Sequence, residues 1–357
     1  MAVISRVYGR RLGDFQTGQA FHHPCEVTLD EGVCSIFYAS FAEASPIYRS
    51  EHFAKALGFN GRVVHPLLLM NFGLSFSVQD IFEQAVANLA WLNVHFPNPA
   101  YVGDTITAYS QVLSATPSKK KNRGTVHIQT TVVDQNNSPV CEFERIILVP
   151  EGKVQNELIS WVGIIPMAMT QYPVLIDNLN FGSGAPTAAF DGFFENFRVG
   201  DILIHNPGRT VGESEQMRLA TLFCNPHALH TDAVYCKTRS FAKRCIVDGG
   251  IAFSYVHALV SRDTGGQAIW TCGFDNGANP NPVLPGDTIR AAQKVIAKEA
   301  ISKFIGKITF RLVGIKNEDP AKLLDQNIEI FKPEKSQKPI SAKILEIDRT
   351  VLLRRKS

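Results

Sequence analysis

Hydrophobic and polar positions follow the same succession twice along the chain. In each half an apolar tract of helical length begins, at position 65 in the first half and at position 248 in the second. A short segment typical of a β-strand follows each tract, at residues 90–92 and 268–272. Because one order of elements occurs twice, we predict a tandem duplication with copies of about 150 residues.

One loop segment aligns the two copies residue by residue. NVHFPNPAYVGDTI at residues 93–106 matches NGANPNPVLPGDTI at residues 276–289 at eight of fourteen positions, without a gap and at a constant offset of 183. Pro and Asn favour turns, Gly permits a positive φ, and Asp before a strand can bond to the backbone. We therefore interpret the segment as a structural loop that begins a strand, and not as a catalytic site.

Patterns typical of antiparallel strands follow each loop, at residues 105–114, 125–133 and 140–148 in the first copy and at 288–295, 307–315 and 344–353 in the second. A single apolar helix cannot bury its surface alone, so a curved sheet must wrap it. We predict an α+β protein with a tandem (double) hot-dog fold, each half an antiparallel sheet around a central helix. Its parts are an N-terminal half at residues 1–150, a linker at 151–191 and a C-terminal half at 192–357.

Composition narrows the class of protein. Of 357 residues, 45% are hydrophobic and 19% charged, and the net charge is only +3, which argues against nucleic acid or a membrane surface as the main partner. Seven cysteines, an odd number without a CxxC pair, favour a reducing compartment. The first fifteen residues lack the apolar region of a secretory signal. We therefore expect a cytoplasmic protein.

The densest polar cluster is the segment LFCNPHALHTD at residues 222–232, which contains Asn225, His227, His230 and Asp232. Three interpretations compete for it. The histidines and Asp232 are acceptable metal ligands, but Pro226 disfavours one continuous helix, and we predict neither a metal nor another cofactor. The cluster is also compatible with an ordinary polar loop.

The third interpretation is acid–base chemistry on a thioester. Histidine is the usual general acid or base near neutral pH. The helix that begins after residue 248 offers free backbone N–H groups and the positive end of its dipole. Gly249 and Gly250 would let a substrate carbonyl approach that backbone closely. These parts together could polarise a carbonyl and deliver water to a conjugated double bond.

This arrangement resembles the MaoC-like (R)-hydratase family, whose motif here is Gly-Asp-x-Asn-Pro-aliphatic-His-x-Asp. The corresponding run is CNPHALHTD at residues 224–232, in which His230 and Asp232 match and Asn225 replaces the family's catalytic aspartate. The segments TVGESEQM, LFCNPHALH, CIVDGG and NPVLPGDTI are similar to the mesaconyl-CoA hydratase subfamily, also called β-methylmalyl-CoA dehydratase. The resemblance implies that Asn225 is a trait of this subfamily.

The resemblance implies reversible hydration of an enoyl-CoA, most closely of mesaconyl-CoA to β-methylmalyl-CoA. His230 would move the proton, Asn225 would orient the water, and the amide of Gly250, with Gly249 as a supporting group, would polarise the thioester. Asp232 would fix a histidine tautomer or only cap the local backbone. The partner would be an acyl-CoA, and two double hot dogs would pair as a homodimer. The sequence does not select an arginine for the second carboxylate of the acyl group among Arg49, Arg62, Arg218 and Arg244.

The first copy lacks the cluster. Its equivalent run is AEASPIYRS at residues 42–50, where Glu43 stands in the place of Asn225 and Tyr48 in that of His230. We therefore expect the second half to be catalytic and the first to shape the acyl-CoA tunnel, with Glu43 as a possible supporting residue. The alternatives are an (R)-specific enoyl-CoA hydratase for another acyl group, a hot-dog acyl-CoA thioesterase that uses Glu43, and a non-catalytic acyl-CoA binder.

Overall fold

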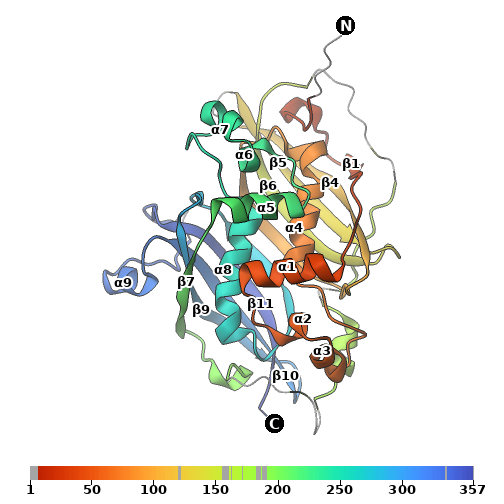
Figure 1. Ribbon diagram of the computed structural model, residues 1–357, viewed down its shortest axis with the longest axis vertical. Helices are drawn as coiled ribbons and strands as arrows, with labels where there is room; N and C mark the ends of the chain where they lie inside the picture. The colour runs from red at the N-terminus through yellow and green to blue at the C-terminus, as the bar shows by residue number, and fades with distance from the viewer. Residues whose placement is uncertain are drawn as a thin grey trace.

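Two central helices lie side by side against a large antiparallel sheet (Figure 1). The computed structural model describes residues 7–119, 122–154, 161, 163–170, 172–181, 186, 191–333 and 336–356. The helices are α4 (Pro66–Phe76) and α8 (Gly249–Thr264), and each begins where the sequence predicts an apolar helix. The α+β class and the repeated plan of one long helix followed by antiparallel strands are confirmed.

The described strands form one antiparallel sheet of eleven strands, in the order β1-β4-β5-β6-β3-β8-β11-β10-β9-β7, with β2 paired to β4. Strands β3 and β8 join the two halves, with Trp91 opposite Gly277. The bounds are β1 Ala20–His22, β2 Val27–Thr28, β3 Ala87–His95, β4 Thr105–Pro117, β5 Arg123–Val133, β6 Pro139–Pro150, β7 Ile202–Thr210, β8 Ala268–Ala278, β9 Thr288–Ala300, β10 Ile305–Lys316 and β11 Lys343–Arg354.

Further helices surround the central pair; some cross it on the viewer's side, and one lies at the left edge of the sheet beside β9 (Figure 1). They are α1 (Glu31–Phe41), α2 (Pro46–Arg49), α3 (Glu51–Leu57), α5 (Glu213–Leu222), α6 (Ala228–Thr231), α7 (Ala233–Arg239) and α9 (Pro320–Asp325). Single turns complete the set at η1 (Leu12–Asp14), η2 (Val78–Phe82), η3 (Val174–Asn178) and η4 (Phe194–Asn196).

The repeated loop has the predicted structural role in both halves. Strands β4 and β9 begin directly after it, and its glycines, Gly103 and Gly286, have φ values of 104° and 95°. Asp104 accepts a hydrogen bond from the Tyr101 amide at 2.7 Å, and Asp287 accepts one from the Leu284 amide at 2.9 Å. The loop is therefore a turn that begins a strand, conserved in geometry between the two copies.

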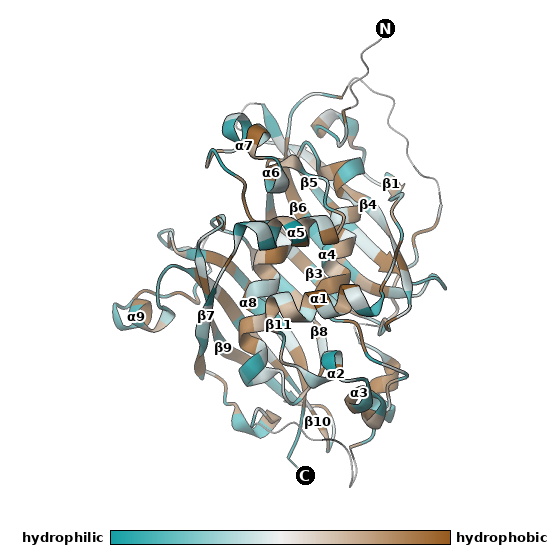
Figure 2. Cartoon of the chain, viewed as in Figure 1, coloured by the Kyte–Doolittle hydropathy of each residue, from teal (hydrophilic) through white to brown (hydrophobic). Residues whose placement is uncertain are grey.

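The core explains why the fold needs both copies. Every residue of α4 is buried, and one continuous cluster of buried side chains includes α1, α4, α8 and strands of both halves. Figure 2 shows hydrophobic residues along α4 and the central strands. Neither helix has a polar face that solvent covers, so each half buries its helix partly against the other.

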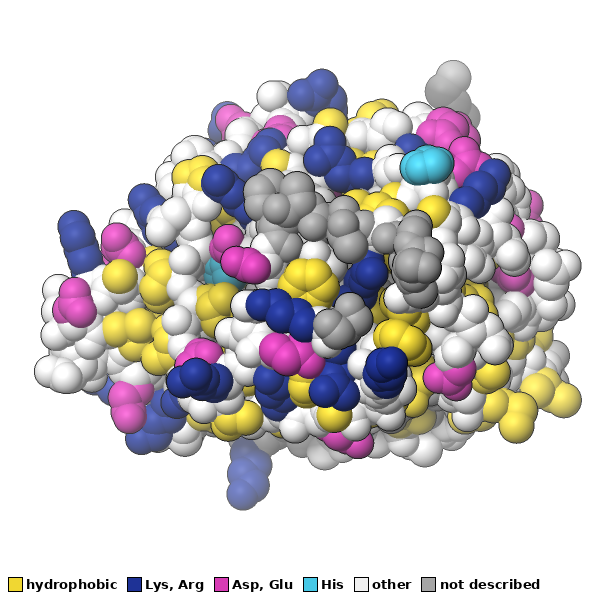
Figure 3. All heavy atoms as spheres, turned by 90° about the horizontal axis from the view of Figure 1, so that it is seen from below, with side chains coloured by type: hydrophobic (Ala, Val, Ile, Leu, Met, Phe, Trp, Pro, Cys, Tyr) yellow, Lys and Arg dark blue, Asp and Glu magenta, His cyan; other side chains and the backbone are white. Residues whose placement is uncertain are grey.

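The outer surface is mixed in character. On the face seen in Figure 3, basic side chains lie next to acidic ones, and apolar side chains reach the surface between them. Within the described ranges, none of the helices combines the length and apolar character needed to cross a bilayer. Of the predicted linker at 151–191, much lies outside the described residues, and the division of the chain at residues 150 and 191 stays a prediction.

Candidate active site

A cavity of about 410 Å³ lies between the two halves. The N-terminal half provides apolar walls from α4, η2 and β3, including Leu74 and Trp91. The C-terminal half provides most of its polar groups, among them Asn225, His230 and Asp248. The structure therefore brings the predicted residues Asn225, His230 and Gly249 to a cavity that the first copy helps to shape.

Asn225 is fixed by the loop that follows α5. Its predecessor Cys224 has a φ of 63°, a left-handed conformation that turns the chain out of the helix. The Asn225 side-chain oxygen accepts a hydrogen bond from the His227 amide at 2.9 Å, and its nitrogen donates to Asp248 Oδ2 at 2.8 Å. The amide keeps one N–H and one lone pair free of these two bonds.

Asp248 is the carboxylate of this site, and the sequence interpretation missed it. The residue caps α8, since Oδ1 accepts from the amides of Gly250 at 2.8 Å and Ile251 at 3.2 Å. Oδ2 accepts from Asn225 and lies 3.4 Å from His230 Nε2. A polar residue directly before two glycines and a buried helix was the available signal, but such a residue usually serves only as a cap.

His230 has a defined tautomer. Its Nδ1 lies 2.9 Å from the carbonyl oxygen of Ile246, which can only accept, so Nδ1 carries the proton. In the neutral ring Nε2 therefore presents a lone pair beside Asp248, on the cavity. His227 differs, because its Nδ1 accepts from the Leu229 amide, and burial, reinforced by the nearby His230, lowers its pKa to about 4. His227 is thus neutral near pH 7.

The glycines at the start of α8 have different roles. The amide of Gly250 donates to Asp248, and a β-carbon at residue 250 would lie 2.3 Å from Asn71 Oδ1. The predicted donor Gly250 is therefore engaged inside the helix cap and faces α4. Gly249 lines the cavity, and none of the hydrogen bonds among the described residues uses its amide. The group available to a substrate carbonyl is accordingly that of Gly249.

Asp232 serves as a helix cap. Its Oδ1 accepts from the amides of Val234 at 2.8 Å and Tyr235 at 2.9 Å, at the start of α7. In the described part of the chain, His227, His230 and Asp232 do not converge into a group of potential metal ligands. Of the two roles predicted for Asp232, these two hydrogen bonds support the cap of the local backbone.

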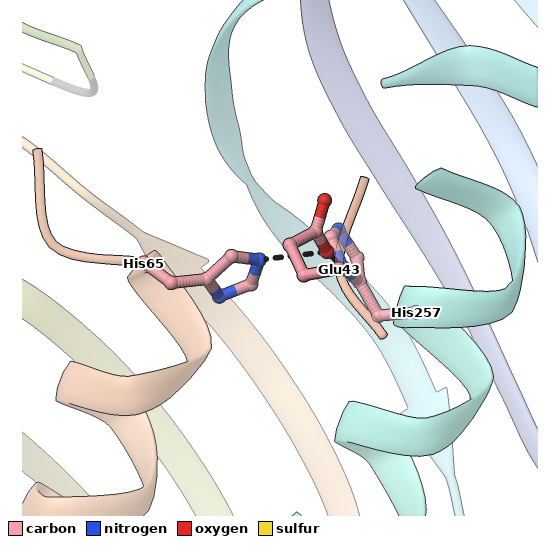
Figure 4. A group of neighbouring side chains, drawn as sticks. All are labelled: Glu43, His65 and His257. Carbon is pink, nitrogen blue, oxygen red and sulfur yellow. Dashed lines mark ion pairs between the residues drawn. The ribbon is translucent and has the colours of Figure 1, made fainter. Parts of the chain in front are cut away.

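A second polar cluster lies in the buried interior and consists of Glu43, His65 and His257 (Figure 4). Glu43 Oε2 is 3.2 Å from His65 Nε2 and 3.7 Å from His257 Nδ1, and all three side chains are at most 2% exposed. Although burial alone would raise it, the two histidines hold the pKa of Glu43 well below its usual value. Burial lowers the pKa of His257 to about 4.

These three residues have the ligand types of a metal site, yet one tautomer argues against that use. His65 Nδ1 accepts a hydrogen bond from the Leu67 amide at 3.1 Å, so in the neutral ring the proton is on Nε2, which points at Glu43. A metal on Nε2 would require a fully deprotonated ring. The geometry therefore favours a carboxylate in polar contact with a protonated ring nitrogen.

The two clusters occupy equivalent places in the two copies. Glu43 accepts from the amide of Ser45, two residues later, as Asn225 accepts from that of His227. Likewise His65 caps α4 through the Leu67 amide, as Asp248 caps α8 through that of Gly250. The offsets of 182 and 183 between these positions match that of the repeated loop.

The comparison with known proteins agrees with this double architecture. The MaoC like domain matches residues 14–134 and again residues 196–311. A putative MaoC domain protein dehydratase from Chloroflexus aurantiacus superimposes with a TM-score of 0.85 at 24% identity, over 98% of both chains. A Mycobacterium tuberculosis protein described as having a double hotdog fold gives 0.70 at 19% identity, over 98% of this chain and 100% of that one. The predicted double hot-dog fold is confirmed.

Two curated relatives extend over most of the chain. The beta-methylmalyl-CoA dehydratase of Chloroflexus aurantiacus is 26% identical over 348 residues, which is 92% of this chain and 98% of that protein. The mesaconyl-CoA hydratase of Cereibacter sphaeroides is 27% identical over 324 residues, which is 87% of this chain and 90% of that protein. The predicted resemblance is therefore confirmed over nearly the full length of the relatives.

Proposed function

The chain belongs to the family of MaoC-like domains, and from that premise we propose that it catalyses the reversible hydration and dehydration of an enoyl-CoA thioester. The names of the two curated relatives support mesaconyl-CoA and β-methylmalyl-CoA as the substrate pair. The observation that carries the proposal is the position of His230 Nε2, 3.4 Å from Asp248 Oδ2, on a cavity that Gly249 also lines.

In the hydration direction, His230 Nε2 takes a proton from a water molecule whose oxygen bonds to the β-carbon of the enoyl group. The π electrons move toward the thioester oxygen, and the amide of Gly249 stabilises the negative charge that develops there. Asp248 stabilises the imidazolium, and the proton then passes from His230 to the α-carbon. Water thus supplies both the hydroxyl and the new C–H proton, and dehydration follows the same path in reverse.

Asn225 has two roles in this proposal. One amide N–H holds Asp248 beside His230, and the other N–H and the free lone pair of the oxygen are available to orient the reacting water. An amide cannot accept the proton of water, so the acid–base work falls to His230. Replacement of the family's aspartate by Asn225 is compatible with catalysis because Asp248 supplies a carboxylate from the helix cap.

An assay with a panel of enoyl-CoA thioesters tests the proposal. With purified full-length protein we expect loss of the conjugated enoyl absorbance without release of free thiol, and a hydroxyacyl-CoA as the product. Turnover of a straight-chain substrate in preference to mesaconyl-CoA would instead favour an (R)-specific hydratase for another acyl group. Binding of CoA thioesters with no turnover of any of them would contradict the enzymatic function.

The thioesterase alternative loses its main residue. Glu43 is not among the residues that line the cavity, and its carboxylate lies between two buried histidines. A nucleophile or base for thioester hydrolysis must reach the carbonyl carbon, and Glu43 is buried in the closed cluster. Release of free CoA thiol in the panel assay would nevertheless restore this alternative.

For the cellular compartment and the oligomeric state, our proposals are those that the sequence suggests. All seven cysteines are free thiols, in agreement with a reducing compartment, and we propose the cytoplasm. Association of two double hot dogs into a dimer is also a proposal. Gel filtration with light scattering distinguishes it from a monomer of 39.4 kDa.

A further inference from the structure

A buried arginine lines the same cavity as the candidate catalytic residues. Arg145 belongs to β6 of the N-terminal half and is 3% exposed. Its Nη2 donates to Ser77 Oγ at 2.8 Å, and its guanidinium carbon lies 3.7 Å from the ring centroid of Phe82. Among the described residues, Nε has no hydrogen-bond partner and no carboxylate lies within ion-pair distance of the group.

The charge of Arg145 is only weakly compensated by the protein. Burial lowers the pKa of Arg145 to about 9, opposed by the attraction of Asp248, so the group is still a cation near pH 7. Asp248, however, already accepts three hydrogen bonds and sits at the positive end of α8. A buried cation with one neutral hydrogen-bond partner is costly unless an anion approaches it.

Arg349 is the equivalent arginine of the C-terminal copy, and its charge is compensated in a different way. Arg145 pairs across the sheet with Trp91 and Ile128, and Arg349 pairs with Phe274 and Phe310, at offsets of 183 and 182 on the partner strands. Arg349 is also buried, but the carboxylate that acts on it is Glu43. In the catalytic half, the position of Glu43 is held by the uncharged Asn225, and the cavity lies there instead.

We infer that Arg145 binds a free carboxylate on the acyl group of the substrate, so that the site selects enoyl-CoA thioesters of dicarboxylic acids. The inference rests on the proposed function and deepens it, because it names the residue that recognises the free carboxylate of the substrate. The planar guanidinium matches a carboxylate with parallel N–H donors, and Arg145 lines the cavity that would hold the acyl group.

The chemistry of such a substrate fits the positions of the other groups. In mesaconyl-CoA the free carboxylate is attached to a carbon of the double bond, at the end opposite to the thioester. A thioester oxygen at Gly249 and a reacting carbon at His230 leave the carboxylate for the remaining cation of the same cavity, Arg145. None of the four arginines that the sequence suggested lines this cavity, whereas Arg145 does.

The test compares two saturated thioesters, succinyl-CoA and butyryl-CoA, which cannot be hydrated. Titration calorimetry with the full chain should show that the wild-type protein binds succinyl-CoA about 10- to 100-fold more tightly, as expected for a charge-assisted contact. Arg145→Gln should remove this preference and leave butyryl-CoA within about threefold. Arg349→Gln, the equally buried control away from the cavity, should retain it.

Two outcomes would overturn the inference: equal affinity of the wild-type protein for both thioesters, or an equal loss of both affinities in Arg145→Gln with Arg349→Gln unaffected. If Arg145→Gln does not fold, the wild-type protein still decides the matter, because the methyl ester of succinyl-CoA should bind as weakly as butyryl-CoA. Binding needs no turnover. A protein that prefers succinyl-CoA but hydrates no enoyl-CoA would contradict the proposed function and keep this inference.

Discussion

The two copies follow the same plan of elements, but the loop before the central helix has a different surrounding in each copy. In the C-terminal copy, Asn225 from the loop, Asp248 from the helix cap and His230 line a cavity. In the N-terminal copy, Glu43 and His65 hold the equivalent positions in a buried cluster. The carboxylate has changed place, from the loop in one copy to the helix cap in the other.

We call the buried cluster of Glu43, His65 and His257 the closed corner, and the cavity-lining group of Asn225, His230 and Asp248 the open corner. Side chains that the open corner lacks fill the closed corner. His257 of α8 points at Glu43, whereas its equivalent on α4, at the offset of 183, is Leu74 on the cavity wall. Tyr48 takes the place of His230 and is 2% exposed, with its ring against that of His65. The comparison teaches that a few rings in one copy fill the space that the cavity takes in the other.

The largest effect on kcat should come from His230, which differs most in role from its equivalent residue, Tyr48. His230→Gln removes the only proposed proton-transfer group, and we expect kcat to fall by about a thousandfold. Tyr48→Phe, at the equivalent place in the first copy, should leave kcat within about twofold, since Tyr48 does not line the cavity of the candidate site. Enoyl-CoA hydration measured on both purified variants checks this. Loss of activity in both would mean that the closed corner also takes part in the reaction.

The second largest effect on kcat should come from the carboxylate of Asp248, which stands at the helix cap and not in the loop. Asp248→Asn keeps an acceptor for the cap of α8 but loses the charge beside His230, and kcat should fall by about a hundredfold with little change in Tm. Adding Asn225→Asp returns a carboxylate to the loop position and should recover at least about tenfold of the loss. Steady-state kinetics on the single and double variants measures both. Full activity of Asp248→Asn would refute a role of this charge in catalysis.

The closed corner should matter for stability. Glu43→Gln leaves the buried cation Arg349 without the carboxylate that acts on it, and the free energy of unfolding should fall by about 3 kcal/mol, while kcat per folded molecule is unchanged. Glu51→Gln breaks an exposed pair with Lys55 and should cost under about 0.5 kcal/mol. Urea denaturation provides the comparison. Equal stability of the two variants would mean that the buried cluster contributes nothing.

The smallest effect concerns pH. The pKa of His257 is about 4 in the folded protein and 6.5 in its ordinary state, so the unfolded chain binds more protons between these values. Stability must therefore fall as the pH decreases from 6.5 toward 4. His257→Leu, which copies Leu74, should make this fall shallower, although His227, whose pKa is also about 4, keeps part of it. Tm measured from pH 7 to pH 4 in both proteins tests the difference.

Much of the fold could be predicted because its signals are local. The constant offset aligned the two copies, and the predicted strands at 105–114 and 288–295 extend in the structure to Pro117 and Ala300. These ends were missed since polar residues there still pair with neighbouring strands across the sheet. The positive φ values of Gly103 and Gly286 were correctly expected, because the turn chemistry depends on residues close in sequence.

The site was predictable only where one short segment holds its residues. His230 and Asn225 were found together because they are five positions apart, and Gly249 was placed second to Gly250 because the helix start alone does not say which amide the cap uses. Asp248 looked like a cap, and its approach to His230 depends on the fold of the intervening loop and α7. Arg145 lies in the other copy, 85 positions before His230, and no sequence pattern connects them.

The sequence by itself determined the duplication, the helix-and-sheet plan of each copy, the strand-starting turn and the family, because each depends on periodicity or on contiguous residues. Only the tertiary structure decided which copy holds the cavity, where the carboxylate stands, and that Arg145 from one half lines the same cavity as His230 from the other. The physical reason is that burial and ionic contacts between residues far apart in the chain are set by the packing of the two central helices and by the pairing of β3 with β8.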